Sequence, residues 1–458
     1  MELPRRQLFD NKKLAVLILP LIFEQLLGTL VSMVDGVMVS SVGEAAISAV
    51  SLVGNISAVM LNLFASLATG GAIVTSQLIG AGNAKKARHS AGQVITMTVG
   101  FSVLVGAICV CFNRGILQLF FNKVEKQVMD DSVTYFFYNA ISFPFLALYS
   151  AGAAILRAKG NSKVSLYVSL LRNLVNIAGN AICIFGLHMG VEGVAIPTAI
   201  SRVVGAATIM VVVLGKEHSL RPGRGDIFCI DRKLMGRMLR VGLPTAFENS
   251  IFQLGRVMTL GMITGFGTYQ IAANSTANTL TGLVVTITTS LRMASMTVIG
   301  QCVGARDEGQ IKDNFKKLLL LEYVLNGVCA VLVIAARYPI LSLYTGLSKE
   351  AVDLAAYLMC IHLGVGIALY PLSFFIAAPL RAANDSAFPM WVSIISMAVF
   401  RLTLARILCV ELGWGAPGVW WAMIVDWICR SICFTWRWFS GAWKKKCGMA
   451  INEKAGEA

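Results

Sequence analysis

Charge is scarce in this chain. Only 14% of its 458 residues are Asp, Glu, Lys or Arg, whereas a soluble protein carries about 25%. Hydrophobic residues make up 56% of the sequence, and the mean hydropathy is +0.71. This composition excludes an ordinary soluble domain and predicts an integral membrane protein.

Motifs for catalysis and metal binding are lacking as well. The 11 Cys include no CxxC pair, and no HxxxD or HExxH pattern surrounds the four scattered His, which are His89, His188, His218 and His362. No GxxxxGK[ST] loop is present, so the chain cannot hydrolyse ATP by that route. We therefore expect no metal, no cofactor and no enzymatic activity, and we assign the cysteines to packing. A membrane-embedded transferase is the enzymatic alternative, and turnover of a lipid or sugar donor would reveal it.

Long apolar segments are abundant, and short polar links separate them. Each has at least 19 residues, enough to cross a hydrocarbon core of about 30 Å at about 1.5 Å per residue. The sequence therefore predicts an all-α integral membrane fold with twelve transmembrane helices. They are residues 14–40, 47–79, 91–112, 133–156, 164–186, 191–215, 238–264, 271–303, 318–336, 351–378, 388–410 and 415–439.

The net charge of +15 indicates membrane topology rather than a nucleic-acid partner. Most Lys and Arg fall in links that a chain with its N-terminus inside would place in the cytoplasm, and cytoplasmic loops favour positive charge. These links are residues 5–13, 85–88, 157–163, 216–240, 306–317, 381 and 430–458. Both termini are therefore predicted to be cytoplasmic. The first apolar segment is too long for the core of a signal peptide, so we expect it to stay as an anchor.

The sequence contains an internal repeat. Shifting the chain along itself by 224 positions (244 minus 20) pairs Pro20, Phe23 and Glu24 with Pro244, Phe247 and Glu248, Gln77 and Gly80 with Gln301 and Gly304, and Leu156, Arg157 and Ala158 with Leu380, Arg381 and Ala382. Six helices per half make the repeat parallel, and such pseudo-twofold bundles bind substrate between the halves. We predict an N-terminal six-helix bundle at 1–215, a basic cytoplasmic linker at 216–237, a C-terminal six-helix bundle at 238–440 and a cytoplasmic tail at 441–458.

Several motifs in both halves resemble one transporter family. They include LPLIFEQLLGTLVSMVDGVMVSSVGEAAISAVS, TSQLIGAGNAKKARHSAGQ, LRAKGNSKVSLYVSLLRNLVNIAGN, GLPTAFENSIFQLGR, VIGQCVGARDEGQ and LRAANDSAFP. They resemble the multidrug and toxic compound extrusion (MATE) family, within the multidrug/oligosaccharidyl-lipid/polysaccharide flippase superfamily. The resemblance covers nearly the whole chain. With the compact loops, it implies a monomeric multi-pass antiporter of the bacterial plasma membrane, which exports organic cationic or amphipathic molecules by alternating access.

The resemblance also implies an ion-coupling site around Asp35. A charge at membrane depth is expensive and therefore a functional candidate. Asp35 follows Pro20 by fifteen positions, where some family members carry the carboxylate that binds a proton or sodium ion, and the other matching positions are Asn176, Asn180 and Thr198. Those members have an acid where this chain has Asn180. A lone buried carboxylate among amides suits a proton, so we expect proton coupling rather than sodium coupling.

The alternative is that Asp35 lies wetted at a helix end and that the Asn residues hold helices together. Asn173, Asn176 and Asn180 follow an i, i+3, i+7 spacing, which places them on one helix face where they could surround Asp35. The repeat favours a specialised site, because general packing contacts would recur in both halves. At an offset of 224 positions, or 225 after one inserted residue for Thr198, the equivalents of Asp35, Asn176, Asn180 and Thr198 are Thr259, Phe400, Leu404 and Met423.

Two further acids occupy equivalent positions of the repeat. Glu24 and Glu248 are expected either to face the substrate cavity or to pair with cavity arginines, and Arg256 could supply such a partner. We take both acids, Arg256, Asn173 and Arg292 as cavity candidates.

Other charged residues lie within predicted helices. If Arg292, Arg401 and Arg406 face the cavity, anionic groups would suit it, which favours the alternative function of a flippase for a lipid-linked sugar or an endogenous amphipathic metabolite. Asp426 and Arg430 are expected to form an i, i+4 ion pair. His362 could take part in coupling, but a packing role is the simpler expectation.

Overall fold

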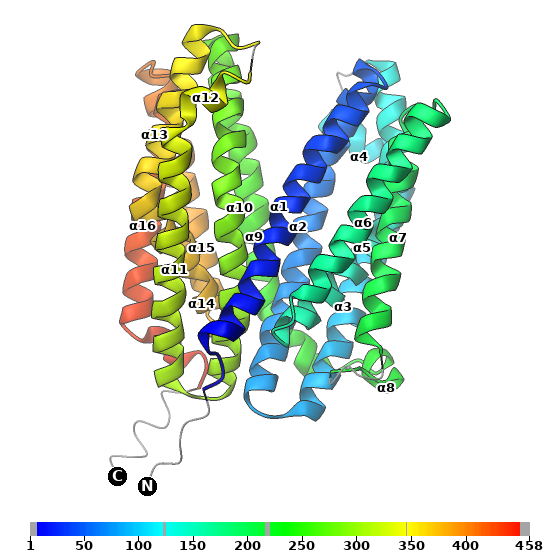
Figure 1. Cartoon of the computed structure of the whole chain (residues 1–458), viewed down its shortest axis with the longest axis vertical. Helices are drawn as coiled ribbons and strands as arrows, with labels where there is room; N and C mark the ends of the chain where they lie inside the picture. Colours follow the sequence, from blue (N-terminus) through cyan, green and yellow to red (C-terminus); the bar gives the residue numbers. More distant parts are fainter. Residues whose placement is uncertain (1–6, 122–124, 216–219, 345, 449–458) are drawn as a thin grey trace. The chain divides into compact units, whose positions relative to one another are not determined.

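The computed structural model describes residues 7–121, 125–215, 220–344 and 346–448. Within these ranges every regular element is a helix, most of them α-helices with short 3-10 and π segments (Figure 1). The chain divides into two compact units. We call residues 11–246 the N-terminal bundle, and residues 247–448 together with Gln7–Asp10 the C-terminal bundle.

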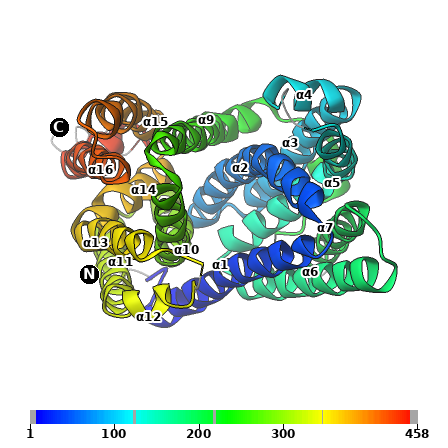
Figure 2. The same ribbon diagram turned by 90° about the horizontal axis from the view of Figure 1, so that it is seen from above.

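The N-terminal bundle is built around α5. This helix contacts α2, α3 and α7, while α6 packs between α1 and α7 (Figure 2). Phe64, Phe136 and Phe143 are fully buried at the centre of the bundle. The elements are α1 (Asn11–Ser40), α2 (Glu44–Gly80), α3 (Ala84–Cys111), α4 (Asn113–Phe120), α5 (Lys126–Ala158), α6 (Lys163–Ala181), η1 (Ile182–Gly186), α7 (Glu192–Val213) and α8 (Arg224–Phe228).

The C-terminal bundle has its largest core around α10, α13 and α16, with Trp420 and Trp427 buried there. Asp307 and Ser348 cap α11 and α13 by accepting hydrogen bonds from backbone N–H groups. The elements after α9 are η2 (Thr264–Phe266), α10 (Thr268–Gly304), α11 (Glu308–Ala335), α12 (Arg337–Leu341), α13 (Lys349–Tyr370), η3 (Pro371–Phe375), α14 (Ala377–Ala382), α15 (Ala387–Ser396), η4 (Met397–Leu404), η5 (Ile407–Glu411), α16 (Ala416–Phe439) and η6 (Ala442–Lys445).

The two units divide within α9 (Arg232–Ile263). The first part of α9 belongs to the N-terminal bundle because it packs against α2: Met238 shares a core with Leu67 and Val74. A Cβ atom on Gly70 would lie 2.6 Å from the carbonyl oxygen of Met238, so only glycine permits this approach of the two helices. The boundaries that the sequence predicts for the bundles, the linker and the tail stay predictions.

Ten helical segments in the described ranges are long and apolar enough to cross a membrane. They correspond to ten of the twelve predicted spans. α9 and α16 occupy the positions of the seventh and twelfth predicted spans and are not among these ten segments. The count of twelve spans and the cytoplasmic termini therefore stay predictions.

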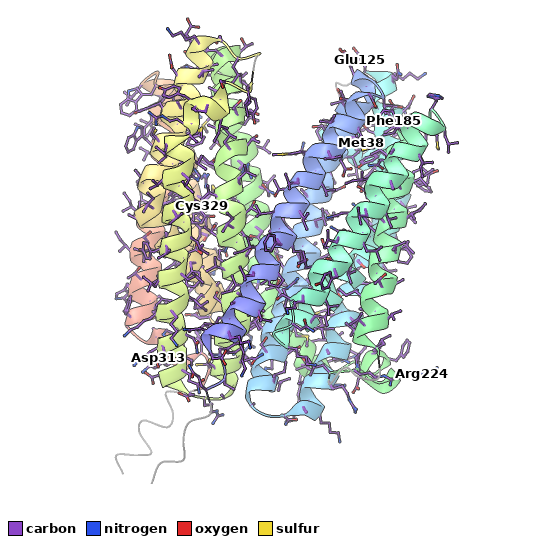
Figure 3. The ribbon with its side chains drawn as sticks, in the orientation of Figure 1. Met38, Glu125, Phe185, Arg224, Asp313 and Cys329 are labelled. Carbon is purple, nitrogen blue, oxygen red and sulfur yellow. The ribbon has the colours of Figure 1, made fainter. Side chains whose placement is uncertain are left out.

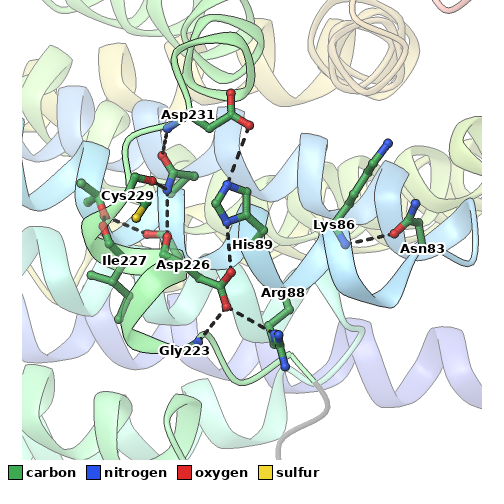
Figure 4. Close-up of polar contacts among 12 residues, drawn as sticks. Asn83, Lys86, Arg88, His89, Gly223, Asp226, Ile227, Cys229 and Asp231 are labelled. Atoms are coloured by element: carbon green, nitrogen blue, oxygen red, sulfur yellow. Dashed lines mark hydrogen bonds and ion pairs between the residues drawn. The ribbon is translucent and has the colours of Figure 1, made fainter.

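The segment before α9 is fastened to α3 by polar contacts (Figure 4). The Asp226 carboxylate accepts from Gly223 N–H at 2.8 Å and lies 3.0 Å from His89 Nδ1 and 3.3 Å from Arg88 Nε. Gln93 Nε2 donates to the carbonyl oxygens of Asp226 and Cys229 at 2.8 and 2.7 Å. Polar residues at the start of α3 thus help to hold the linker in place.

Asp226 should make this attachment depend on pH. Partial burial raises the pKa of Asp226, but the hydrogen bonds from Gly223 and His89 and the charge of Arg88 outweigh it, so the pKa lies below its ordinary value. The ionised carboxylate therefore stabilises the docked linker at neutral pH, and this contribution is lost as the pH falls through the lowered pKa.

We expect Asp226→Asn to undock the linker at neutral pH, because it weakens the contacts with His89 and Arg88. Hydrogen exchange of the backbone amides of residues 223–231 should accelerate, while exchange in the apolar part of α3 stays unchanged. Asp130→Asn is the control, since Asp130 is an exposed partner of Arg114 on other helices. Unchanged exchange in Asp226→Asn would show that the carboxylate does not hold the linker.

Candidate functional site

Asp35 meets the fifth predicted span, as the resemblance implies. It lies partly buried on α1, and Asn180 Nδ2 of α6 donates to its Oδ1 at 3.0 Å. Asn180 is itself fully buried. The structure therefore brings the lone carboxylate of α1 against a buried amide, and Asp35 is not an isolated charge at a helix end.

Asn176 and Thr198 complete the group. The Asn176 side chain lies one turn before Asn180 and 3.2 Å from Thr198 Oγ1. When the orientation of the Asn176 amide is chosen to suit its neighbours, its nitrogen lies 3.0 and 3.1 Å from the two oxygens of Asp35, and its oxygen accepts from Thr198. All four residues predicted for ion coupling are thus contiguous.

Close packing of α6 on α7 holds this group together. A Cβ atom on Gly179 would lie 2.7 Å from Cβ of Pro197, so glycine is needed where the two helices meet. Gly179 directly precedes Asn180, and Pro197 directly precedes Thr198. The small residue and the proline therefore set the distance between the polar side chains of the two helices.

Asn173 does not join the group, although the spacing of the three asparagines suggested it. Its Oδ1 is 3.5 Å from Arg172 Nη2, and its Nδ2 is buried without a hydrogen-bond partner among the described residues. The prediction that all three amides surround Asp35 is wrong for Asn173, because this residue lies too far along α6 and faces the side chain of Arg172.

Arg202 is a charged residue of α7 that sequence reasoning missed. It lies one turn after Thr198 on α7, and its Nη1 donates to Ser142 Oγ at 2.6 Å. Tyr135 of α5 interacts electrostatically with both Arg202 and Asp35. A single arginine in an otherwise apolar span was the signal that could have revealed a positive charge on the same helix as Thr198.

Glu24 and Glu248 have different partners despite their equivalent positions. Glu24 accepts from Ser165 Oγ at 3.0 and 2.9 Å and from Tyr149 at 3.3 Å. Glu248 accepts from Ser393 Oγ at 2.8 Å and pairs with Arg381 Nη2 at 2.5 Å. The acid of the second half is therefore paired with an arginine, and the acid of the first half is held by hydroxyl groups.

Arg381, rather than Arg256, is thus the cation that pairs with Glu248. Arg256 lies two turns further along α9 with an exposed side chain. The sequence could not reveal Arg381 as the partner, because the two residues are 133 positions apart and belong to different helices.

A second charged cluster in the C-terminal bundle consists of Asp426, Arg430 and Arg401. The predicted i, i+4 pair is confirmed: Arg430 Nε lies 2.9 Å from Asp426 Oδ1, and both residues are buried. Arg401 adds a second arginine, with Nη1 3.8 Å from Asp426 Oδ2 and its guanidinium over the ring of Phe252.

His362 packs edge-on against aromatic rings. Its ring centroid is 5.5 Å from that of Trp420 and 4.9 Å from that of Trp427. These contacts agree with the simpler expectation of a packing role. In the described residues, no group of three or more His, Cys, Asp or Glu side chains is placed to hold a metal ion.

Comparison with known proteins identifies the family of this chain. The model of the MatE family matches this chain twice, at residues 20–182 and 244–407. The chain belongs to the MatE family. The two matches begin 224 positions apart (244 minus 20), which agrees with the internal repeat. Asp35, Asn176 and Asn180 lie in the first match of this MatE protein, and Thr198 lies 16 positions beyond its end (198 minus 182).

Three bacterial relatives match this MatE protein over nearly their whole length. It is 26% identical over 439 residues to an uncharacterised transporter, YisQ, of Bacillus subtilis, covering 94% of each chain. It is 25% identical to a probable multidrug resistance protein, NorM, of Thermotoga maritima, covering 97% of this chain and 96% of the relative. It is 22% identical to the multidrug export protein MepA of Staphylococcus aureus, covering 89% of each.

Solved structures share the fold. One is an outward-facing multidrug resistance MATE transporter, with a TM-score of 0.86 and 19% identity, covering 95% of this chain and 96% of that one. Another is a transporter from Pyrococcus furiosus whose binding pocket is described as having reverse polarity, with a TM-score of 0.84, 20% identity and coverage of 94% and 96%. This MatE protein is therefore a multi-pass transporter of small molecules in the bacterial inner membrane.

Proposed function

We propose that this chain is a proton-driven antiporter that exports organic cationic or amphipathic molecules by alternating access, and that it works as a monomer. The observation that carries the proposal is the placement of Asp35 against Asn176, Asn180 and, through Asn176, Thr198. The names of the bacterial relatives support export of drug-like compounds. The driving ion must come from a gradient, because the sequence offers no nucleotide-binding loop.

The orientation of Asn180 supports a proton over a sodium ion. A sodium ion is a hard cation that needs oxygen ligands, as calcium and magnesium do. Asn180 instead turns its nitrogen toward Asp35, and its oxygen is buried without a partner among the described residues. With N–H donors aimed at it, the carboxylate has few oxygen atoms beside it in this conformation for a metal cation to bind.

The amide of Asn176 can serve both protonation states of Asp35. When the acid is ionised, the Asn176 nitrogen donates to it and the Asn176 oxygen accepts from Thr198. When the acid is protonated, its O–H can donate to the Asn176 oxygen, while the nitrogen donates to Thr198 Oγ1 and Thr198 donates to the carbonyl oxygen of Val194. Rotation of one amide group by half a turn thus accommodates a proton without moving the helices.

The choice of ion can be tested in proteoliposomes with ethidium as the probe. We expect ethidium export to continue when sodium is absent and to stop when the pH gradient is collapsed by an ionophore. A sodium gradient alone should not drive it, because the site holds only one carboxylate. Strict dependence on sodium at constant pH would refute proton coupling and leave the family assignment intact.

A second candidate function is export of an amphiphile with a phosphate group, such as a lipid-linked sugar. It is favoured by the buried cluster in which two arginines, Arg401 and Arg430, share the single acid Asp426. Neither Arg401 Nη1 nor Asp426 Oδ2 has a hydrogen-bond partner among the described residues. Running the same proteoliposomes with a phosphate-bearing amphiphile in place of ethidium distinguishes the two candidates.

A further inference from the structure

Glu322, near the middle of α11, is an acid in an otherwise uncharged stretch of helix. From Leu318 to the end of this helix at Ala335, Glu322 is the only charged residue. It lies fourteen residues after the start of the helix, about 21 Å along the axis at about 1.5 Å per residue. Figure 3 labels Asp313 near one end of α11 and Cys329 further along, and Glu322 lies between them in sequence. The acid is therefore at membrane depth.

Glu322 is fully buried without a hydrogen-bond partner. Its exposed fraction is 0%, and neither carboxylate oxygen accepts a hydrogen bond within the described ranges. Leaving an ionised carboxylate in this situation costs several kcal/mol or more, and a protonated carboxylic acid avoids most of that cost. The surroundings of Glu322 thus suit the neutral acid in this conformation.

Arg292 is the charged group available to pair with Glu322. It lies on α10, interacts electrostatically with Glu322, and has its own Nε buried without a partner among the described residues. Arg292 does not donate a hydrogen bond to Glu322, because both Glu322 oxygens are without a partner among the described residues. A small displacement of α11 against α10 would bring together two groups that are both incompletely satisfied.

Few other titratable groups face Glu322. From α13, Tyr370 interacts electrostatically with both Arg292 and Glu322. His362 of α13 points instead to Trp420 and Trp427, and η3 contains no titratable residue. On α11 itself, Tyr323 donates to the carbonyl oxygen of Ala368 at 3.2 Å. At the far end of α11, Arg337 of α12 donates to the carbonyl oxygen of Ile334.

The segment opposite Glu322 is irregular. α13 ends at Tyr370 and continues as the π-helix η3, which begins with Pro371. Asn326, one turn after Glu322, donates to the carbonyl oxygen of Gly366 at 3.0 Å. Short π-helices occur frequently at functional sites, and a proline frees backbone groups of the helix before it. The acid therefore lies beside the part of α13 whose backbone is least regular.

Glu322 and Arg292 have no charged equivalents in the first half of the repeat. At the offset of 224 positions, Glu322 corresponds to Thr98 and Arg292 to Ala68. Thr98 is a buried residue whose hydroxyl donates to the carbonyl oxygen of Val94. Helix packing alone therefore does not require an acid and an arginine at these two positions.

We propose that Glu322 is a second proton-binding site, in the C-terminal bundle, where it holds a proton in this conformation and releases it when Arg292 comes close enough to pair with the ionised acid. Asp35 would then not be the sole proton carrier of the transporter. The inference rests on the proposed proton-driven export for its role in transport. The protonation state itself can be measured without any transport.

The test is infrared difference spectroscopy of the purified full-length protein across a pH titration, because a protonated carboxylic acid has its own carbonyl stretch. We expect the wild type to show such a band at neutral pH and Glu322→Gln to lack it. Glu308→Gln is the matched control, since Glu308 starts the same helix and is paired with Lys312 and Lys444. Arg292→Gln should keep the band to higher pH, because the ionised acid has lost its partner.

A wild-type spectrum that Glu322→Gln leaves unchanged would overturn the inference and would show an ionised, structurally paired acid. If Glu322→Gln fails to fold, the titration of Arg292→Gln decides, because an ionised acid would give no band that persists to higher pH. In proteoliposomes, Glu322→Gln should lose most of its pH-driven ethidium export and retain exchange without a gradient. Failure of the wild type to move ethidium would count against the proposed function alone, since the infrared result does not depend on transport.

Discussion

Replacing Asp35 by Asn should reduce pH-driven export of ethidium to the level of empty liposomes. The substitution keeps the size of the side chain but removes the only group of the Asp35, Asn176, Asn180 and Thr198 cluster that can bind and release a proton. Exchange of ethidium across the membrane without a gradient should continue, because substrate binding does not require the coupling acid. The measurement is ethidium flux in proteoliposomes, with and without an imposed pH gradient.

The fold of the variant should be preserved. Asn180 Nδ2 can still donate to the new amide oxygen, and Asn176 can turn its amide to suit it. Asp130→Asn serves as the control for loss of a carboxylate from the same bundle, because Asp130 is exposed and pairs with Arg114 at 3.5 Å. If Asp35→Asn still couples export to the pH gradient, Asp35 is not the coupling residue.

The candidate site was predictable because its parts follow local spacing. Asn176 and Asn180 are one turn apart, so they had to share a face of α6, and the family resemblance supplied Asp35 and Thr198. The same spacing predicted that Asn173 would also lie beside Asp35, but its side chain contacts the neighbouring Arg172 instead. A helical periodicity indicates the face on which a residue lies, but it cannot indicate which side chain occupies the space in front of that face.

Long-range partners could not be predicted from one sequence. Nothing near Glu248 or Arg381 in the chain indicates that these residues pair, since their contact depends on how α9 and α14 pack. Glu322 was overlooked for a different reason, because an apolar run satisfies the criterion for a span whether or not it contains one acid. Its meaning becomes visible only when the structure shows that neither of its oxygens is satisfied.

The helices themselves were predicted best where they are uniformly apolar. The ten segments that qualify as spans follow from their hydrophobic length, whereas α9 and α16 do not qualify although the sequence predicts spans at their positions. The π-helices η1, η3, η4 and η5 were not predicted. An additional residue in a helical turn leaves the hydrophobic pattern almost unchanged, so such a feature depends on local packing and, in η3, on Pro371.

Glu248→Gln should destabilise the protein far more than Glu24→Gln. Without the carboxylate, Arg381, which is only 3% exposed, loses its ionic partner. Breaking one member of a buried ion pair costs about 3–5 kcal/mol, which corresponds to a decrease on the order of 10 °C in the apparent unfolding temperature. In Glu24→Gln the new amide oxygen can still accept from Ser165 or Tyr149, so we expect a cost of about 1 kcal/mol.

The two acids form a matched comparison, because they occupy equivalent positions of the repeat and differ in their partners. Thermal unfolding of the purified variants in detergent measures the difference, and the double variant Glu248→Gln with Arg381→Met should recover much of the loss, because it removes the unpaired buried charge as well. Equal destabilisation by Glu24→Gln and Glu248→Gln would mean that the contact with Arg381 contributes little to stability. The charge of Glu248 would then be available for a role in binding substrate.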